Sequence, residues 1–218
     1  MNRRGLRYLV VLGLLLFSQG AMASCNGVVQ KHAHIQWSNP ANIVSPNKMW
    51  QLEVHPDLTS DENRSQIFLR RCSDEKFFNL FTLERNAEVY WGGGDGHLLV
   101  IDQPTTDVSK LILIDTKSLF DTKKSLSYLD LNNEIQGDVK RRLGAARHIE
   151  FYLLNFVEWD DGTLVLGVGG TTSSGANGPM TPYCYGVRLD SNTSSVKNLI
   201  SADDLRSRFN NASCVVFP

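Results

Sequence analysis

One pattern, tryptophan followed by a turn and an apolar run, occurs three times and is the strongest constraint on how this chain folds. It starts at Trp37, Trp91 and Trp159, each preceded by an apolar residue two positions earlier. The apolar runs that follow span residues 49–54, 97–101 and 163–166. Asp-Gly steps precede the last two runs, and such a step is a strong hairpin signal because glycine tolerates positive φ. The pattern predicts three antiparallel hairpins, with all three tryptophans largely buried.

A second element recurs downstream of each predicted hairpin. It is an apolar strand followed by an Asp-bearing polar turn, at residues 66–70, 111–114 and 185–189. Further short strands are expected at Phe77–Phe81 and Val196–Ile200. A unit repeated at intervals above 20 residues indicates supersecondary units that bury their faces against one another.

This order of elements resembles one blade of the TolB-like (WD40-like) β-propeller repeat. The best matches are residues 91–101 with 110–118, and 159–166 with 185–193. The resemblance implies an all-β, propeller-like fold of antiparallel hairpin repeats. Three units fall short of the typical 4–8 blades, and the tryptophan spacings of 54 and 68 residues exceed a blade of about 40–45. A closed ring, a sandwich and an open arc all remain compatible with the sequence.

Three segments depart from the β pattern. Residues 132–147 predict a short helix, and residues 203–209 predict a helical turn with Ser201 as its cap. The stretch Gly169–Pro182 is rich in Gly, Thr and Ser and predicts a long loop, and long loops often carry function. We therefore expect a candidate binding loop with the residues Gly170, Thr171, Ser174, Asn177 and Pro179.

The first 23 residues have the layout of a cleavable secretory signal. Three arginines precede an apolar run, and Ala21-Met22-Ala23 predicts cleavage before Ser24. The run is unbroken from Leu9 to Phe17 apart from Gly13, and even when counted from residue 6 to residue 17 it holds only 12 residues, fewer than the roughly 20 that a membrane-spanning helix needs. We expect a periplasmic or secreted protein without a stable membrane anchor, whose residues 24–218 form a single β-rich domain.

Four cysteines, Cys25, Cys72, Cys184 and Cys214, remain after cleavage. An even number in an exported protein predicts two disulfides. Lipidation of Cys25 is disfavoured, because the preceding residues lack the usual leucine. We favour Cys25–Cys214 with Cys72–Cys184, since a propeller-like arrangement joins its chain ends. The main alternative contains a Cys184–Cys214 bond.

The charge of the mature chain gives no reason to expect nucleic acid as a partner. The predicted signal holds three of the 22 basic residues and none of the 23 acidic ones, so the remainder carries a net charge of −4.

Candidate catalytic and metal-binding groups are sparse. His32 and His34 alternate on one predicted strand, but no third ligand is placed by the sequence. The serines between Gly169 and Gly175 do not form a G-x-S-x-G elbow, and no spacing ties His55, His97 or His148 to a serine. The glycine clusters do not fit a nucleotide-binding motif. We expect no cofactor and no metal.

The sequence therefore predicts an exported, non-enzymatic binding protein whose partner is another exported or periplasmic protein. Inhibitors and toxin-immunity proteins are one concrete subclass, by analogy. The alternative is a periplasmic hydrolase or carbohydrate-binding protein with a site built from loops. A ligand site of that kind is expected to leave Trp91 or Trp159 open in a cleft, whereas a scaffold buries both.

Overall fold

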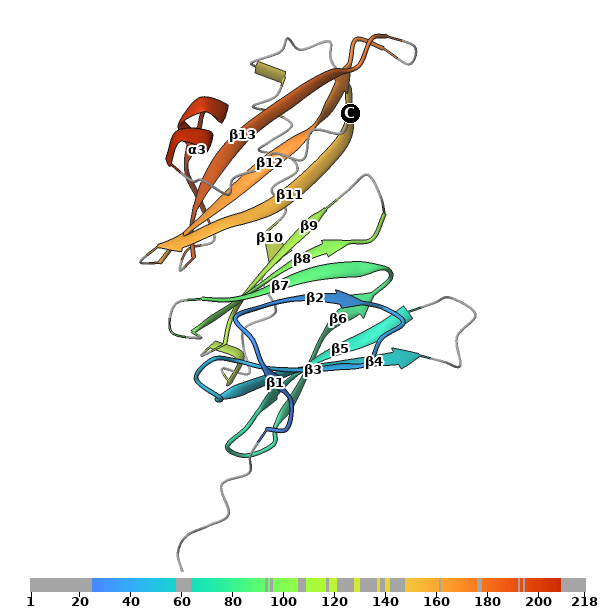
Figure 1. Cartoon of the computed structure of the whole chain (residues 1–218), viewed down its shortest axis with the longest axis vertical. Coiled ribbons are helices and arrows are strands. Elements are labelled where there is room, and N and C mark those ends of the chain that lie inside the picture. Colours follow the sequence, from blue (N-terminus) through green and yellow to red (C-terminus); the bar gives the residue numbers. More distant parts are fainter. Residues whose placement is uncertain are drawn as a thin grey trace, which may run out of the picture.

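A computed structural model describes residues 25–57, 64–92, 94, 96–105, 109–116, 118–120, 128–129, 137, 140–141, 148–160, 162–175, 178–191, 193 and 195–208. The fold is all-β with little helix, as the hairpin pattern predicts (Figure 1).

The strands form three sheets, each built on a four-stranded antiparallel meander. Sheet A contains β3 (Ala41–Val44), β4 (Trp50–Asp57), β5 (Arg64–Arg71) and β6 (Phe77–Leu83), with β1 (Val28–Val29) parallel to β3. Sheet B contains β7 (Asn86–Gly92), β8 (His97–Gln103), β9 (Lys110–Asp115) and β10 (Tyr128–Leu129), with β2 (His32–Gln36) antiparallel to β7. Sheet C contains β11 (His148–Asp160), β12 (Thr163–Ser173), β13 (Thr181–Asp190) and β14 (Ser195–Ile200). A short 3-10 helix, η1 (Ser118–Phe120), follows β9.

One backbone hydrogen bond recurs at the same place in all three sheets. The residue after the third strand of each meander donates its N–H to the carbonyl oxygen just before the second strand. The three bonds are Cys72 to Met49 (2.9 Å), Thr116 to Gly96 (3.0 Å) and Ser191 to Gly162 (2.9 Å). They align the three meanders residue by residue and define the structural repeat.

Two of the three predicted hairpins are confirmed, and the first is wrong. β7–β8 and β11–β12 are antiparallel hairpins in which Trp91 and Trp159 lie on the first strand. Trp37 instead follows β2, which pairs with β7 in sheet B, while β4 pairs with β3. The repeat alignment puts Val44 at the position of the other two tryptophans. The N-terminal segment crosses from sheet A to sheet B, and this crossing separates Trp37 from the hairpin that follows it in sequence.

The prediction that all three tryptophans are largely buried is confirmed for Trp91 only. Trp91 is 1% exposed and belongs to the core between sheets A and B. Trp37 and Trp159 are only half-buried and pack against the edges of the two cores.

Sheet B lies between sheets A and C and is buried on both faces (Figure 1). One face packs onto sheet A through Leu98, Val100, Ile112 and Ile114. The other packs onto sheet C through Leu99, Ile101, Leu111 and Leu113. A strand buried on both faces needs an unbroken apolar run instead of alternation, which is why 98–101 and 111–114 read as continuous apolar segments.

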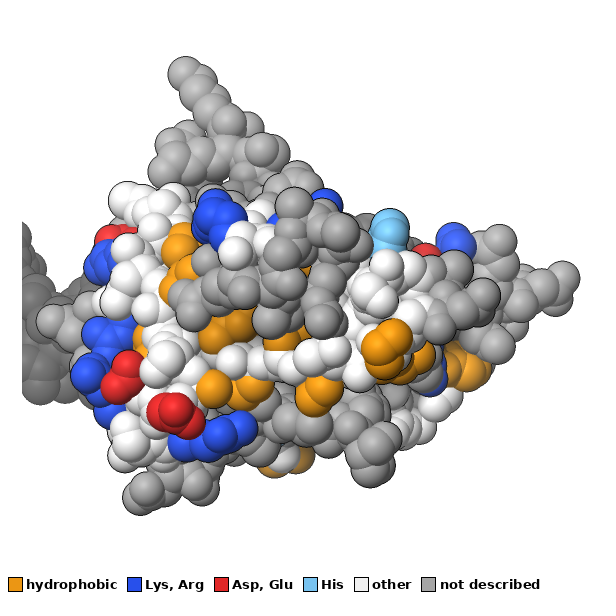
Figure 2. Space-filling view, turned by 90° about the horizontal axis from the view of Figure 1, so that it is seen from above, with side chains coloured by type: hydrophobic (Ala, Val, Ile, Leu, Met, Phe, Trp, Pro, Cys, Tyr) orange, Lys and Arg blue, Asp and Glu red, His pale blue; other side chains and the backbone are white. Residues whose placement is uncertain are grey.

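Helix α3 (Ala202–Arg208) covers the face of sheet C that points away from sheet B. Leu205 is fully buried there, against Val165 and Ile200. The predicted cap is confirmed: the Asp204 N–H donates to Ser201 Oγ (3.1 Å), and Ser201 Oγ donates to Asp204 Oδ2 (2.9 Å). Figure 2, which looks onto this end of the molecule, shows several patches of hydrophobic side chains on this face.

The helix expected at residues 132–147 falls mostly outside the described residues. Of this segment only Gly137, Lys140 and Arg141 are described, and all three are helical. The signal and its cleavage site, residues 1–23 with Ser24, also lie outside the described part of the chain.

The architecture shares with a propeller only the repetition of four-stranded antiparallel meanders. Three meanders stack face to face, and the described residues contain no fourth sheet that would close a ring. One end of the stack is covered by α3, so a further sheet has no free face there.

Candidate functional site

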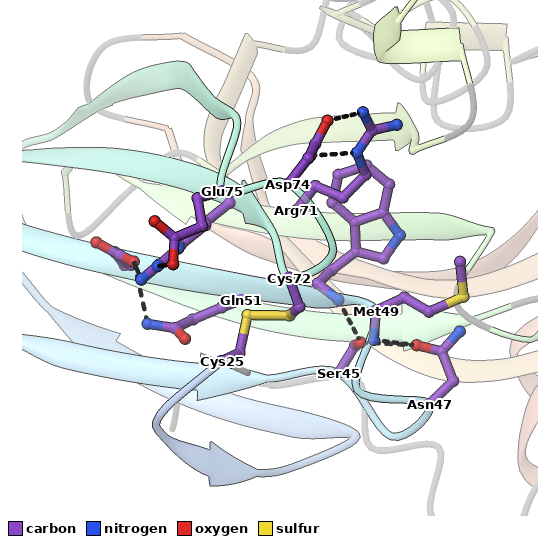
Figure 3. The surroundings of a disulfide bond; sticks show 12 residues. Cys25, Ser45, Asn47, Met49, Gln51, Arg71, Cys72, Asp74 and Glu75 are labelled. Atoms are coloured by element: carbon purple, nitrogen blue, oxygen red, sulfur yellow. Dashed lines mark hydrogen bonds and ion pairs between the residues drawn. A yellow bond between two sulfur atoms is a disulfide. The ribbon is translucent and has the colours of Figure 1, made fainter. Parts of the chain in front are cut away.

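A disulfide joins Cys25 to Cys72, with Cα atoms 5.1 Å apart and a sequence separation of 47 (Figure 3). The favoured pairing is therefore wrong, because this bond excludes both Cys25–Cys214 and Cys72–Cys184. The bond connects the segment just before β1 to the residue that follows β5, two strands that belong to the same sheet. Cys184, on β13, is also disulfide-bonded, and Cys214 lies outside the described residues. Of the three possible pairings, only the alternative containing Cys184–Cys214 agrees with the Cys25–Cys72 bond.

Disulfides persist in oxidising compartments and are rare in the cytosol. The Cys25–Cys72 bond is therefore consistent with a location outside the cytoplasm. In the described part of the chain, no helix has the length and apolar character needed to span a bilayer.

The outer face of sheet A differs from the equivalent faces of the other two sheets. The repeat alignment matches Gln51 with Leu98 and Leu164, and Glu53 with Val100 and Leu166. In sheets B and C these leucines and valines pack onto the preceding sheet. We call the outer surface formed by Gln51, Glu53, His55, Arg70 and Phe77 the terminal face. Because these positions are polar in sheet A, no further sheet packs onto them, and sheet A is the terminal unit of the stack. Terminal units of repeat proteins commonly have such a polar outer face.

Glu53 is the centre of a polar network on the terminal face. Its carboxylate accepts a hydrogen bond from Gln51 Nε2 (3.0 Å) and lies 2.9 Å from His55 Nε2 and 3.6 Å from Arg70 Nη1. Arg70 Nη2 also pairs with Glu75 (2.8 Å), and its guanidinium carbon lies 5.3 Å from the centre of the Phe77 ring. Glu53 is only 7% exposed, and the hydrogen-bond donors around its carboxylate compensate for the cost of burying the charge.

Two atoms of this network lack a hydrogen-bond partner. Gln51 is 3% exposed and its Oε1 is unpaired, and Arg70 Nε is buried without an acceptor. Figure 3 places Gln51 beside the disulfide. Phe77 is 52% exposed on the same face. The sequence analysis did not predict this surface, because its residues come from three strands. The available signal was local: polar side chains at 51, 53 and 55 within an otherwise strand-like run.

A second cluster joins strands β2 and β7. The register places His34 opposite Glu88 and His32 opposite Tyr90. His32 Nε2 lies 2.5 Å from Glu88 Oε2, and His34 Nδ1 lies 2.7 Å from Glu88 Oε1. Glu88 is the third group that the sequence could not place, because it lies 54 residues from His34. In this arrangement the three side chains close on one another, and no group of three or more His, Cys, Asp or Glu residues among those described encloses a space for an ion.

Stacked rings continue from this cluster toward sheet C. The His32 ring stacks on Tyr90 at 4.4 Å and 5°, and Tyr90 stacks on Phe156 of β11 at 4.2 Å. Burial raises the pKa of Tyr90 to about 12, with a further contribution from the Glu88 charge. The stacking fixes the orientation of the His32 ring.

Asp102, at the end of β8, is a buried carboxyl between sheets A and B. It is 5% exposed and its Oδ1 has no hydrogen-bond partner. Burial raises the pKa of Asp102 to about 6; the Lys110 charge opposes this shift and the Glu84 charge adds to it. No serine or other nucleophile is hydrogen-bonded to it among the described residues, so we assign it no catalytic role.

The predicted binding loop is shorter than expected. β12 continues to Ser173 and β13 begins at Thr181, so Gly170 and Thr171 are strand residues paired with Tyr183 and Pro182. The central position of β12, between β11 and β13, imposes strand geometry on a glycine-rich segment with weak strand propensity. Ser174 and Pro179 do lie in the exposed β12–β13 connection, and Asn177 is outside the described residues.

Comparison with known protein families, with curated proteins and with solved structures found no match for the chain.

Proposed function

We propose that the chain is an exported, non-enzymatic interaction protein that binds another exported or periplasmic protein through the terminal face of sheet A. Inhibitors and toxin-immunity proteins are the subclass we favour by analogy. In this proposal the three meanders are propeller-like units in an open arc, in which two sheets serve as scaffold and the terminal sheet carries the contact surface.

The exposed Phe77 ring with the Arg70 guanidinium beside it is the observation that carries the proposal. Phe77 is 52% exposed on the terminal face, and the guanidinium carbon of Arg70 lies 5.3 Å from the centre of its ring. Arginine and aromatic residues dominate the binding energy of protein interfaces, and Arg70 is held against Phe77 by two carboxylates before any partner arrives.

Trp91 supports a scaffold over a carbohydrate-binding or hydrolase site. It is 1% exposed, so it offers no surface to a ligand. Trp159 packs on Gly92 and lies 5.7 Å from the His97 ring, but it is only half-buried and does not discriminate between the two classes.

The disulfide supports export as part of the same proposal. A cleaved signal at residues 1–23 delivers the chain to a compartment in which Cys25–Cys72 forms and persists.

Chemical crosslinking in the native host, with an exposed hydrophobic residue changed on each of two surfaces, tests the proposal. We expect Phe77→Ser to abolish capture of a defined partner protein that the wild type captures. Met180→Ser is the matched control, because Met180 is 63% exposed in the β12–β13 connection. Loss of capture with Met180→Ser alone moves the contact surface to that connection, and absence of any partner for the wild type overturns the proposal.

A further inference from the structure

The first residues of β6 form a free edge of sheet A. β6 is the last strand of this sheet and, among the described strands, pairs only with β5 (Figure 1). The Arg71 N–H donates to the Lys76 carbonyl oxygen (2.9 Å), so this opposed pair is a hydrogen-bonded one. Hydrogen-bonded and non-hydrogen-bonded pairs alternate along an antiparallel ladder. The pairs that contain Phe77 and Asn79 are therefore of the second kind, and the backbone N–H and C=O groups of both residues point away from β5.

These outward groups lie where another strand can reach them. Phe77 is 52% exposed, and Asn79 is exposed as well. Their outward backbone groups make no hydrogen bond to any other residue that the structure describes. Beyond Asn79 the ladder shifts by one residue, so that Leu80 forms a bulge and ends the regular edge. The free edge therefore consists of residues 77–79.

β6 lacks the charged side chains that protect other sheet edges. Natural proteins protect edge strands with charges, proline, bulges or a very short length. Of the other edge strands among the described residues, β1 and β10 have two residues each, β2 carries two histidines, β11 carries Glu158, and β14 carries Lys197. β6 has seven residues without a proline or an ionisable side chain. Its bulge at Leu80 protects only the second half of the strand.

The free edge is complementary to itself. A second copy placed antiparallel about a two-fold axis at Phe78 sets Phe77 of each copy opposite Asn79 of the other. The outward N–H and C=O groups then form two hydrogen-bonded pairs with four N–H···O=C bonds. Phe78 meets its counterpart on the axis, and aromatic residues directly opposite each other stabilise antiparallel strands. Because β6 is uncharged, no like charges meet across the axis.

We propose that the chain forms a symmetric dimer by antiparallel pairing of residues 77–79 of two copies. The two copies of sheet A then form one continuous sheet, and the two-fold axis perpendicular to it keeps both terminal faces on the same side. Directly opposite residues share a face of a sheet, so Asn79 of the second copy lies beside Phe77 on the terminal face. The dimer joins the two terminal faces into one surface. The pairing itself does not depend on the proposed partner binding.

Sedimentation velocity of the purified, disulfide-bonded protein over a concentration series tests the dimer. We expect the wild type to shift from monomer to dimer as the concentration rises. Asn79→Pro removes an outward N–H, and an edge strand tolerates proline where its N–H faces solvent. This change should weaken association by at least about tenfold, because it removes two of the four bonds. Asn79→Ala is the matched control, because it removes the same side chain but keeps the N–H, and it should associate like the wild type.

A pair of charge variants tests the register without proline. Phe77→Lys/Asn79→Lys and Phe77→Glu/Asn79→Glu each place like charges directly opposite one another in a homodimer, so neither should self-associate. A mixture of the two variants should form heterodimers, because each lysine then meets a glutamate. Amide hydrogen exchange of the wild type gives a second readout. The N–H groups of Phe77 and Asn79 should become protected as the concentration rises, whereas that of Phe78, which faces β5, should be protected throughout.

Three results overturn the dimer. They are a wild type that stays monomeric throughout the series, growth beyond two copies, and equal association of Asn79→Pro and Asn79→Ala when both melt at the wild-type temperature. Protection of the Phe77 and Asn79 amides only after a captured partner binds also overturns it, and assigns the free edge to a strand of that partner. A monomer that still captures a partner through Phe77 leaves the proposed function standing.

Discussion

The indole of Trp159 lies directly on the backbone of Gly92. A Cβ atom added at Gly92 would lie 2.1 Å from Cδ2 of the indole, far inside van der Waals contact. The contact joins β11 of sheet C to the end of β7 of sheet B, next to the glycine-rich turn that the sequence pattern marks. Glycine is required there because the two sheets approach each other closely.

Gly92→Ala is therefore expected to destabilise the protein. Overpacking of this kind costs about 1–3 kcal/mol in free energy of unfolding, measured by urea denaturation. Gly167→Ala is the control, because its added Cβ meets Val157 at an ordinary 3.7 Å. Combining Gly92→Ala with Trp159→Ala should cost less than the sum of the two single changes. Additive costs would show that the two residues are not in contact.

The buried Asp102 carboxyl should make stability depend on pH. Its pKa of about 6 in the folded protein lies above the value of about 3.9 in an unfolded chain. Its contribution to stability is therefore fully present below about pH 4 and is lost as the pH rises through 6, a change of about 3 kcal/mol. Asp102→Asn should flatten this part of the pH profile and raise stability at pH 7. The exposed control Asp203→Asn should keep the wild-type profile, and an unchanged profile in Asp102→Asn would contradict the assignment.

Ser201 caps the helix that covers sheet C. Ser201→Ala removes the acceptor for the Asp204 N–H and is expected to cost about 1 kcal/mol. Thermal denaturation measures this loss. Ser207→Ala serves as the comparison, since Ser207 lies in the last turn of α3 and donates to the Asp204 carbonyl oxygen (3.1 Å). Equal effects of the two changes would argue against a capping role.

Peptide mapping without reduction should recover Cys25 linked to Cys72. The same digest should yield a peptide that links Cys184 to Cys214, the one pairing compatible with the first bond. Closing a loop with a sequence separation of 47 stabilises by about 4 kcal/mol in the chain-entropy model. Cys25→Ser with Cys72→Ser should lower the denaturation midpoint accordingly. Recovery of a Cys72–Cys184 peptide would contradict the structure.

Local chemistry in the sequence determined the strands, two of the three hairpins and the cap of α3. The reason is that Asp-Gly turns, alternating or continuous apolar runs and the Ser201 cap act over a few residues. The continuous runs at 98–101 and 111–114 also contained the information that sheet B is buried on both faces, although the sequence alone did not say against what.

Tertiary structure decided everything that depends on which strands become neighbours. The crossing of the N-terminal segment assigned Trp37 to sheet B and brought Cys25 to Cys72, which reversed the favoured disulfide pairing. Strand pairing also placed Glu88 between His32 and His34, and put Gln51, Glu53 and Arg70 on a single face. Contacts between residues some 15 to 55 positions apart follow from sheet order and register. The free energy that selects this order comes from burying whole sheet faces against one another, and no short segment of the sequence specifies which faces meet.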